Sequence, residues 1–200
     1  MLTVSPPVAA PGERYSYAST NYLVLGLLII GVTKDYMQDF MSADSVGIAK
    51  NAAIFVGMLL GITMAANVWM VIWKNQKIVL ANAANVIAGG EADPGAAAAG
   101  RRAVLASRQN MIFSVSMLFF MVGAAHFYSV FAEASSSDAS MFLMISCAII
   151  ALFELNAIGI FGGIKAGNKM LWMYESHKNA LITSGILWLV LWILSEVMLG

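Results

Sequence analysis

Residues 53–73 read AIFVGMLLGITMAANVWMVIW and carry no charged side chain. A helix of this length spans the roughly 30 Å hydrocarbon core of a bilayer, because each residue advances the helix by about 1.5 Å. Three more stretches, 111–131, 141–164 and 180–199, have a similar length and apolar character, and a fifth reaches that length when it is extended to 15–37. The pattern predicts an all-α integral membrane protein, a helical bundle of about five transmembrane helices. The stretch 15–37 also fits a helix that lies on the membrane surface.

The overall composition supports this prediction. The 200 residues are 60% hydrophobic and 11% charged, the formal net charge is zero and the mean hydropathy is +0.79. A soluble domain carries about 25% charged residues, and a nucleic-acid-binding protein carries a basic excess, so both classes are excluded. Cys147 is the single cysteine, which excludes an internal disulfide, and His126 and His177 are too few to form a zinc site.

The Lys and Arg residues set the expected orientation. If the N-terminus is cytoplasmic and five helices cross, all 11 basic residues except Lys34 and Lys50 fall on the cytoplasmic side, as the positive-inside rule requires. We therefore expect an N-in, C-out multi-pass membrane protein. Residues 1–14 are expected to form a non-membrane lead-in and residues 15–200 a single transmembrane domain. A cytoplasmic helical hairpin is expected at 74–110.

Polar side chains within the predicted spans are candidate functional residues, because ionisable groups are costly at membrane depth. Counted along their helices, His126 and Glu196 lie about 22 and 24 Å from the inner end, so the two are at a matching depth for pairing. Glu154 and Asn67 lie at about 15 and 9 Å, which predicts a hydrogen bond between them. The alternative role for all four groups is to tie helices together or to bind a partner subunit.

His126 is also the candidate cofactor ligand. A bis-histidine haem b is excluded, because His177 lies about 20 Å from His126 along the membrane normal. Ligation of haem b by His126 alone or with a methionine stays open, as does a quinone site. We expect that this chain requires no cofactor and holds no metal site, and the sequence contains no complete set of catalytic residues.

Two pairs of glycines predict close helix packing. Gly57 and Gly61 stand four residues apart within one predicted span, and Gly159 and Gly163 do the same within another. Such spacing lets two membrane helices approach closely. We expect these two helices to pack on one another, in agreement with the expected Asn67–Glu154 bond.

One stretch carries a more specific pattern. The Gly57 helix is followed by Met-Ala-Ala-Asn-Val-Trp at 64–69, Asn-Gln-Lys at 75–77, Asp-Pro at 93–94 and then His126. Over about residues 30–127, this order resembles the second half of the membrane domain of the membrane-anchored bacterial urate oxidases. The resemblance implies a location in the bacterial inner membrane and a link to cytochrome-dependent urate oxidation. In that family the membrane domain is followed by a cytochrome c domain.

The chain departs from the family's pattern at three positions. Lys74 stands where the family has a proline, Phe55 where it has a histidine, and Ala125 where it has a polar residue. These differences imply that the chain keeps the scaffold of the family and not its catalytic activity.

The expected function is therefore that of a non-catalytic subunit of a larger membrane complex of the respiratory or electron-transfer type. Its expected partners are other integral membrane subunits, the lipid bilayer and, through a partner, cytochrome c or a quinone, but not nucleic acid. The alternative is a haem- or quinone-binding redox module related to the cytochrome-linked urate oxidases. A transporter that uses Glu154 is a third candidate, which the lack of an internal repeat disfavours.

Overall fold

The computed structural model describes Leu28 and residues 45–126 and 134–200. These residues form helices, turns and loops without a β-strand, which confirms the all-α prediction. The predicted lead-in at 1–14 lies outside the described residues, and so does the predicted helix at 15–37 apart from Leu28.

The chain divides into two compact units, residues 1–42 and 43–200, and the helices below belong to the second. They are α3 (Ser45–Ala66), the π-helix η1 (Asn67–Ile72), α4 (Trp73–Ile87), α5 (Ala96–His126), α7 (Ser136–Ala157), the 3₁₀ turn η2 (Lys169–Leu171), α8 (Trp172–Glu175) and α9 (His177–Leu199).

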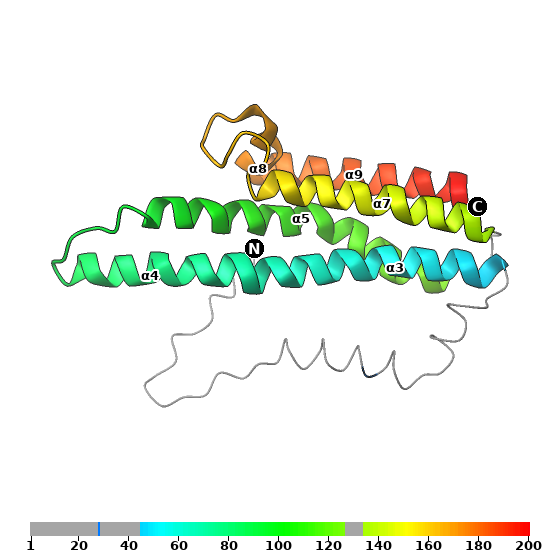
Figure 1. The fold of residues 1–200 in the computed structure, drawn as a ribbon, viewed down its shortest axis with the longest axis horizontal. Helices are drawn as coiled ribbons and strands as arrows, with labels where there is room; N and C mark the ends of the chain where they lie inside the picture. The colour runs from blue at the N-terminus through cyan, green and yellow to red at the C-terminus, as the bar shows by residue number, and fades with distance from the viewer. Residues whose placement is uncertain (1–27, 29–44, 127–133) are drawn as a thin grey trace. The chain divides into compact units, whose positions relative to one another are not determined.

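The helices α3, η1 and α4 follow one another without a break and form one rod, in which no proline interrupts the backbone ladder. At about 1.5 Å per residue the rod is about 65 Å long, roughly twice the thickness of a hydrocarbon core. It therefore extends well beyond any membrane that it crosses. The 31-residue helix α5 packs along the rod in the opposite direction (Figure 1).

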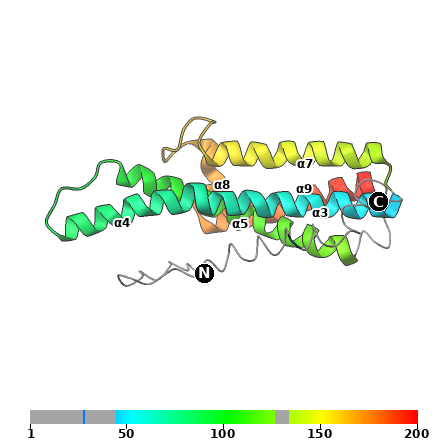
Figure 2. The same ribbon diagram turned by 60° about the horizontal axis from the view of Figure 1, so that its bottom comes forward.

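Four of the described helices are long and apolar enough to cross a membrane: the α3–α4 rod, α5, α7 and α9. They pack in a ring, in which α3 contacts α5, α5 contacts α9, α9 contacts α7 and α7 contacts α3. The two ribbon views show these helices side by side (Figures 1 and 2). The predicted membrane-type helical bundle is thus confirmed for four helices. Its fully buried core includes Val56, Leu60, Phe113, Phe120, Phe142 and Leu191.

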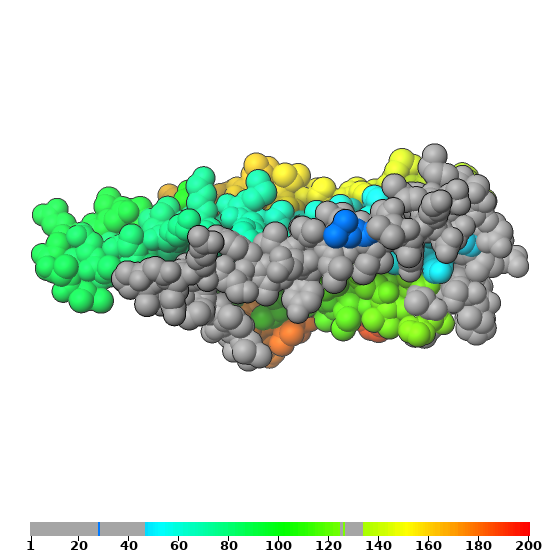
Figure 3. Space-filling model, turned by 90° about the horizontal axis from the view of Figure 1, so that it is seen from below, coloured from blue at the N-terminus to red at the C-terminus, as the bar shows by residue number. Residues whose placement is uncertain are grey.

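The predicted hairpin is formed by α4 and the first half of α5. Gly89, with φ of +85°, lets the chain leave α4 in a left-handed conformation that glycine adopts without strain. The turn is closed by side chains: the Asp93 amide donates to Asn82 Oδ1 at 2.6 Å, and Asn85 Nδ2 donates to the Glu91 carbonyl at 2.6 Å. In the space-filling view the atoms of the hairpin gather at one end of the described residues (Figure 3).

The predicted span 141–164 is corrected by the structure, because α7 ends at Ala157. Gly159, with φ of +91°, terminates the helix: its amide bonds the Asn156 carbonyl, and the next amide, Ile160, bonds the Leu155 carbonyl. This pair of bonds is the Schellman arrangement that glycine favours after a helix. Gly163 also has a positive φ, of +79°, and lies in the loop that follows. The prediction that Gly159 and Gly163 form a helix-packing ridge is therefore wrong.

Gly57 does serve close packing, but its neighbour is α5. A Cβ atom on Gly57 would lie 3.0 Å from both the backbone nitrogen and the Cγ of Met121, whereas one on Gly61 would lie 3.9 Å from Met117 Cγ. Without a side chain at Gly57, α3 and α5 come into backbone contact. The helices α3 and α7 are neighbours as expected, but not through paired glycine ridges.

Candidate functional site

Asn67 lies at the centre of a polar cluster that joins three helices. Its Nδ2 atom donates to Glu154 Oε2 on α7 at 3.0 Å and to Asn110 Oδ1 on α5 at 3.1 Å. Asn110 Nδ2 in turn donates to the carbonyl of Met64 on α3 at 2.9 Å. The predicted Asn67–Glu154 hydrogen bond is therefore present, and both protons of the Asn67 amide are used. We call Asn67, Asn110 and Glu154 the Asn67 cluster.

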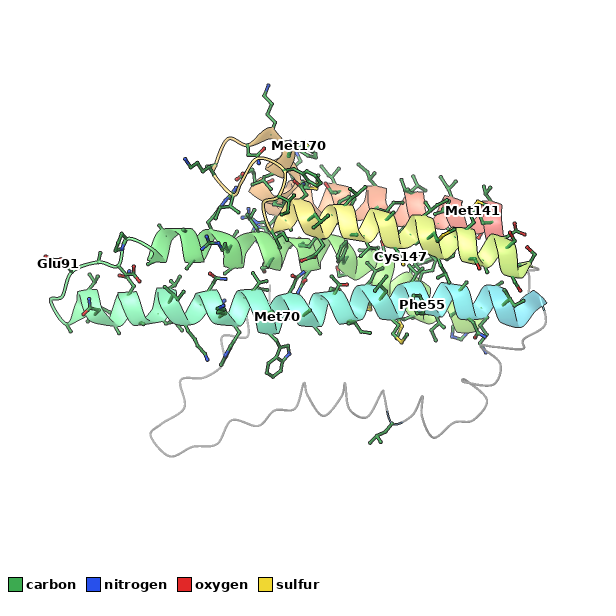
Figure 4. The ribbon with its side chains drawn as sticks, in the orientation of Figure 1. Phe55, Met70, Glu91, Met141, Cys147 and Met170 are labelled. Atoms are coloured by element: carbon green, nitrogen blue, oxygen red, sulfur yellow. The ribbon has the colours of Figure 1, made fainter. Side chains whose placement is uncertain are left out.

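The Asn67 cluster coincides with an irregularity in the rod. Asn67 is the first residue of η1, where the backbone widens into π-helix and the amide of Trp73 bonds the carbonyl of Val68, five residues back. π-Helical turns are rare and are frequently found at functional sites. Met70, in the middle of this segment, lies halfway along the rod (Figure 4).

A second polar pair lies beside the cluster. The Tyr174 hydroxyl on α8 donates to Gln109 Oε1 at 2.7 Å and also lies 3.0 Å from the Phe153 carbonyl. Burial raises the pKa of Tyr174 above its ordinary value, and the nearby Glu154 carboxyl raises it further. Gln109 is fully buried; its Nε2 atom faces the Glu154 carboxyl without reaching hydrogen-bond geometry to any group.

Two arginines of α5 hold α8 and the loop before it in place next to the Asn67 cluster. Arg108 donates to the Tyr174 carbonyl. Arg101 donates through Nε to the Ile164 carbonyl at 2.9 Å and through its two terminal nitrogens to the Glu175 carboxylate. The hydrogen bonds from Arg101 to the Glu175 carboxylate hold the pKa of Glu175 below its ordinary value.

The position of Glu154 differs from the predicted one. Because α7 ends at Ala157, Glu154 lies in the last turn of the helix, about 5 Å from its end instead of about 15 Å. Asn67 lies less than two helical turns before Trp73 and Lys74, where the apolar run of the rod ends. The Asn67 cluster therefore marks the hairpin-side border of the apolar part of the bundle, not its centre.

A cavity of about 410 Å³ lies one helical turn from the cluster, on the same three elements. Met70 and Lys74 contribute from the rod, Arg102 and Ala106 from α5, and Ile158 from the end of α7. We call it the Lys74–Arg102 pocket. Apolar side chains form most of its wall, and Lys74 and Arg102 are the ionisable residues that line it.

His126 and Glu196 are not brought together. His126 is the last residue of α5 and its side chain is exposed, while Glu196 Oε1 accepts a hydrogen bond at 3.0 Å from Trp192 on its own helix. The expected pairing of the two is therefore not formed. Among the described residues no group of three His, Cys, Asp or Glu side chains could hold a metal ion. The role of His126 as a haem ligand stays a prediction.

Sequence reasoning missed Gln109, Asn110 and Tyr174. The adjacent polar pair 109–110 immediately before the apolar run 111–131 was the available signal for the first two. Tyr174 gave no such signal, because its approach to the cluster depends on the loop after α7.

Comparison with known proteins gives one family. A family described as "Urate oxidase N-terminal" matches residues 15–190. No curated protein and no solved structure matches the chain. The family match includes α3, α4, α5 and α7 and most of α9, so it extends well beyond the stretch 30–127 in which the resemblance was noted. The chain belongs to the urate oxidase N-terminal family.

Proposed function

We propose that the chain is a non-catalytic integral membrane subunit of a larger complex of the respiratory or electron-transfer type. The observation that carries this proposal is the hairpin, which extends beyond the apolar part of the bundle and still exposes large apolar side chains. Leu80 is 64% exposed and Ile87 87% exposed, and Ile78 and Val86 are also exposed. Apolar side chains gathered outside a membrane are typical of a protein–protein contact.

The hairpin is suited to docking because it is already ordered. Its turn is closed by the side chains of Asn82 and Asn85, and α4 packs closely on α5 where Val79 Cγ2 lies 3.6 Å from the Cβ position of Gly100. A preformed surface loses little conformational entropy on binding. We therefore assign the hairpin as the contact with a partner subunit.

The Asn67 cluster agrees with a scaffold role. Its amide protons are directed to other protein groups, and the bonds connect the rod, α5 and α7. Polar groups of this kind hold membrane helices in register. The family's description names urate oxidase, so a subunit that acts beside a urate-oxidising chain, with cytochrome c or a quinone reached through that partner, is the most specific form of the proposal.

The test is purification from native membranes in a mild detergent, followed by mass spectrometry of the co-purifying chains. We expect larger redox subunits in fixed ratio with this chain. The double variant Leu80→Ser/Ile87→Ser should lose them, because it removes apolar contact from the hairpin. Ile160→Ser is the matched control: Ile160 is 63% exposed but lies in the loop after α7, so this variant should keep the partners. A single chain without partners in the wild-type preparation would contradict the proposal.

The alternative proposal is a redox module that binds a quinone or a haem. It is favoured by the buried Gln109 Nε2 atom, which lies near the Glu154 carboxyl but makes no hydrogen bond of full geometry. A buried donor of this kind requires an acceptor, and a quinone carbonyl is one. In that case the purified chain should retain a quinone that Gln109→Leu releases, or show a Soret band that His126→Ala removes. Retention of either group by the chain separated from all partners would overturn the scaffold proposal.

A further inference from the structure

The Lys74–Arg102 pocket combines an apolar wall with two exposed cations. The wall is formed by Met70 and Ile78 of the rod, Ala106 of α5 and Ile158 at the end of α7. Lys74 and Arg102 line the same cavity of about 410 Å³ from opposite helices of the hairpin. An occupant that fits both features is an amphiphile with a negative head.

Neither cation is paired with an acidic side chain in the part of the chain that the structure describes. Among the described residues, no carboxylate lies within ion-pair distance of either Lys74 or Arg102. Arg101, the neighbour of Arg102, differs because it is paired with Glu175. Two unpaired cations that line one cavity attract an anion more strongly than either does alone.

The pocket also lies at the right height for a lipid headgroup. It begins one turn below the Asn67 cluster, where the apolar part of the bundle ends and Trp73 and Lys74 follow. Tryptophan and lysine are enriched at the level of the headgroups. Basic pockets between membrane helices at this level are known to hold anionic headgroups.

We propose that the Lys74–Arg102 pocket binds an anionic phospholipid, with the phosphate between the two cations and the start of an acyl chain along Met70 and Ile158. A free phosphate makes no use of the apolar wall, and a neutral quinone makes no use of the cations. The site is independent of the proposed subunit role, since it needs only the bundle and the bilayer.

The test is native mass spectrometry of the purified full-length chain with phosphatidylglycerol, phosphatidylcholine or inorganic phosphate added. Phosphatidylglycerol should bind preferentially. Lys74→Ala/Arg102→Ala should weaken its binding about thirtyfold, because two basic contacts are lost. The control Lys165→Ala/Lys169→Ala removes the same charge from exposed positions between α7 and α8 and should leave the binding unchanged. The charge-conserving variant Lys74→Arg/Arg102→Lys should bind phosphatidylglycerol as the wild type does.

Three results would overturn the proposal: equal binding of the two lipids, equal loss in both charge variants, or phosphate binding as tight as that of phosphatidylglycerol. Displacement of the lipid by a soluble quinone analogue would instead assign the pocket to a redox ligand. Melting temperatures of the variants identify any that fail to fold, and for those the charge-conserving variant decides.

Discussion

At the scale of single residues, Asn67 makes the most specific prediction. Asn67→Ala removes the donor to both Glu154 and Asn110, so the free energy of unfolding should fall by about 1 kcal/mol, the usual size of an interhelical hydrogen bond in membranes. Thermal unfolding in detergent measures the change. Thr63→Ala, which removes a hydrogen bond within α3 itself, is the control and should have a smaller effect.

Replacement of Glu154 distinguishes two roles of its carboxyl group. Glu154→Gln retains an oxygen that can accept from Asn67, so a purely structural cluster should tolerate it, whereas Glu154→Leu should lower the melting temperature as Asn67→Ala does. If Glu154→Gln unfolds as readily as Glu154→Leu, the negative charge itself is required and the structural assignment is wrong.

Glu175 gives the pH dependence. Its folded pKa lies below the ordinary value of 4.5, chiefly because Arg101 donates hydrogen bonds to the carboxylate. Its contribution to stability is thus fully present above about pH 4.5 and is lost as the pH falls through the lower, folded pKa. Hydrogen exchange of residues 169–176, corrected for the intrinsic rate, should become faster as the pH falls well below 4.5. Glu175→Gln should abolish this pH step, and the effect should be modest because the pair is partly exposed.

At the scale of helices, Gly57 and Gly61 form a matched pair. A methyl group at Gly57 meets the Met121 backbone at 3.0 Å and must push α3 and α5 apart, while one at Gly61 reaches only ordinary contact at 3.9 Å. Gly57→Ala should therefore destabilise the bundle by about 1–3 kcal/mol. Gly61→Ala should be neutral or stabilising by up to about 1 kcal/mol, because alanine favours helix. Unfolding curves that rank the two variants in the reverse order would contradict the assigned α3–α5 contact.

The helices also indicate which features sequence reasoning could reach. Hydropathy located four helices, because a long apolar run is a local property of the sequence. The Asn67–Glu154 bond was also predicted and is present, although the depth assigned to Glu154 was wrong because α7 ends at Ala157. The end of α7 was missed because Gly159-x-x-x-Gly163 fits a packing ridge as well as it fits a helix cap, and only the backbone conformation separates the two readings. Tyr174 was missed because the loop that places it is held by Arg101 and Arg108, nearly 70 residues earlier in the chain.

At the scale of the whole molecule, the distribution of charge sets the orientation. Eight of the nine described basic residues lie around the hairpin, the segment after α7 and the start of α9, at one end of the bundle: Lys74, Lys77, Arg101, Arg102, Arg108, Lys165, Lys169 and Lys178. The ninth, Lys50, lies near the start of α3 at the other end. The segment that begins α7, Ser135–Ser140, carries Asp138 and no basic residue. By the positive-inside rule the hairpin end should be cytoplasmic.

Single cysteines test this orientation, because Cys147 is the only native one. In a Cys147→Ala background, Ser137→Cys should react with a membrane-impermeant thiol reagent that is added to the outside of intact cells. Glu91→Cys, at the tip of the hairpin, should react only after the membrane is broken. Both positions are exposed, and α5 is the described helix between them that is long and apolar enough to cross a membrane. The reversed pattern would invert the topology, and labelling of both positions from one side would mean that α5 does not cross the membrane.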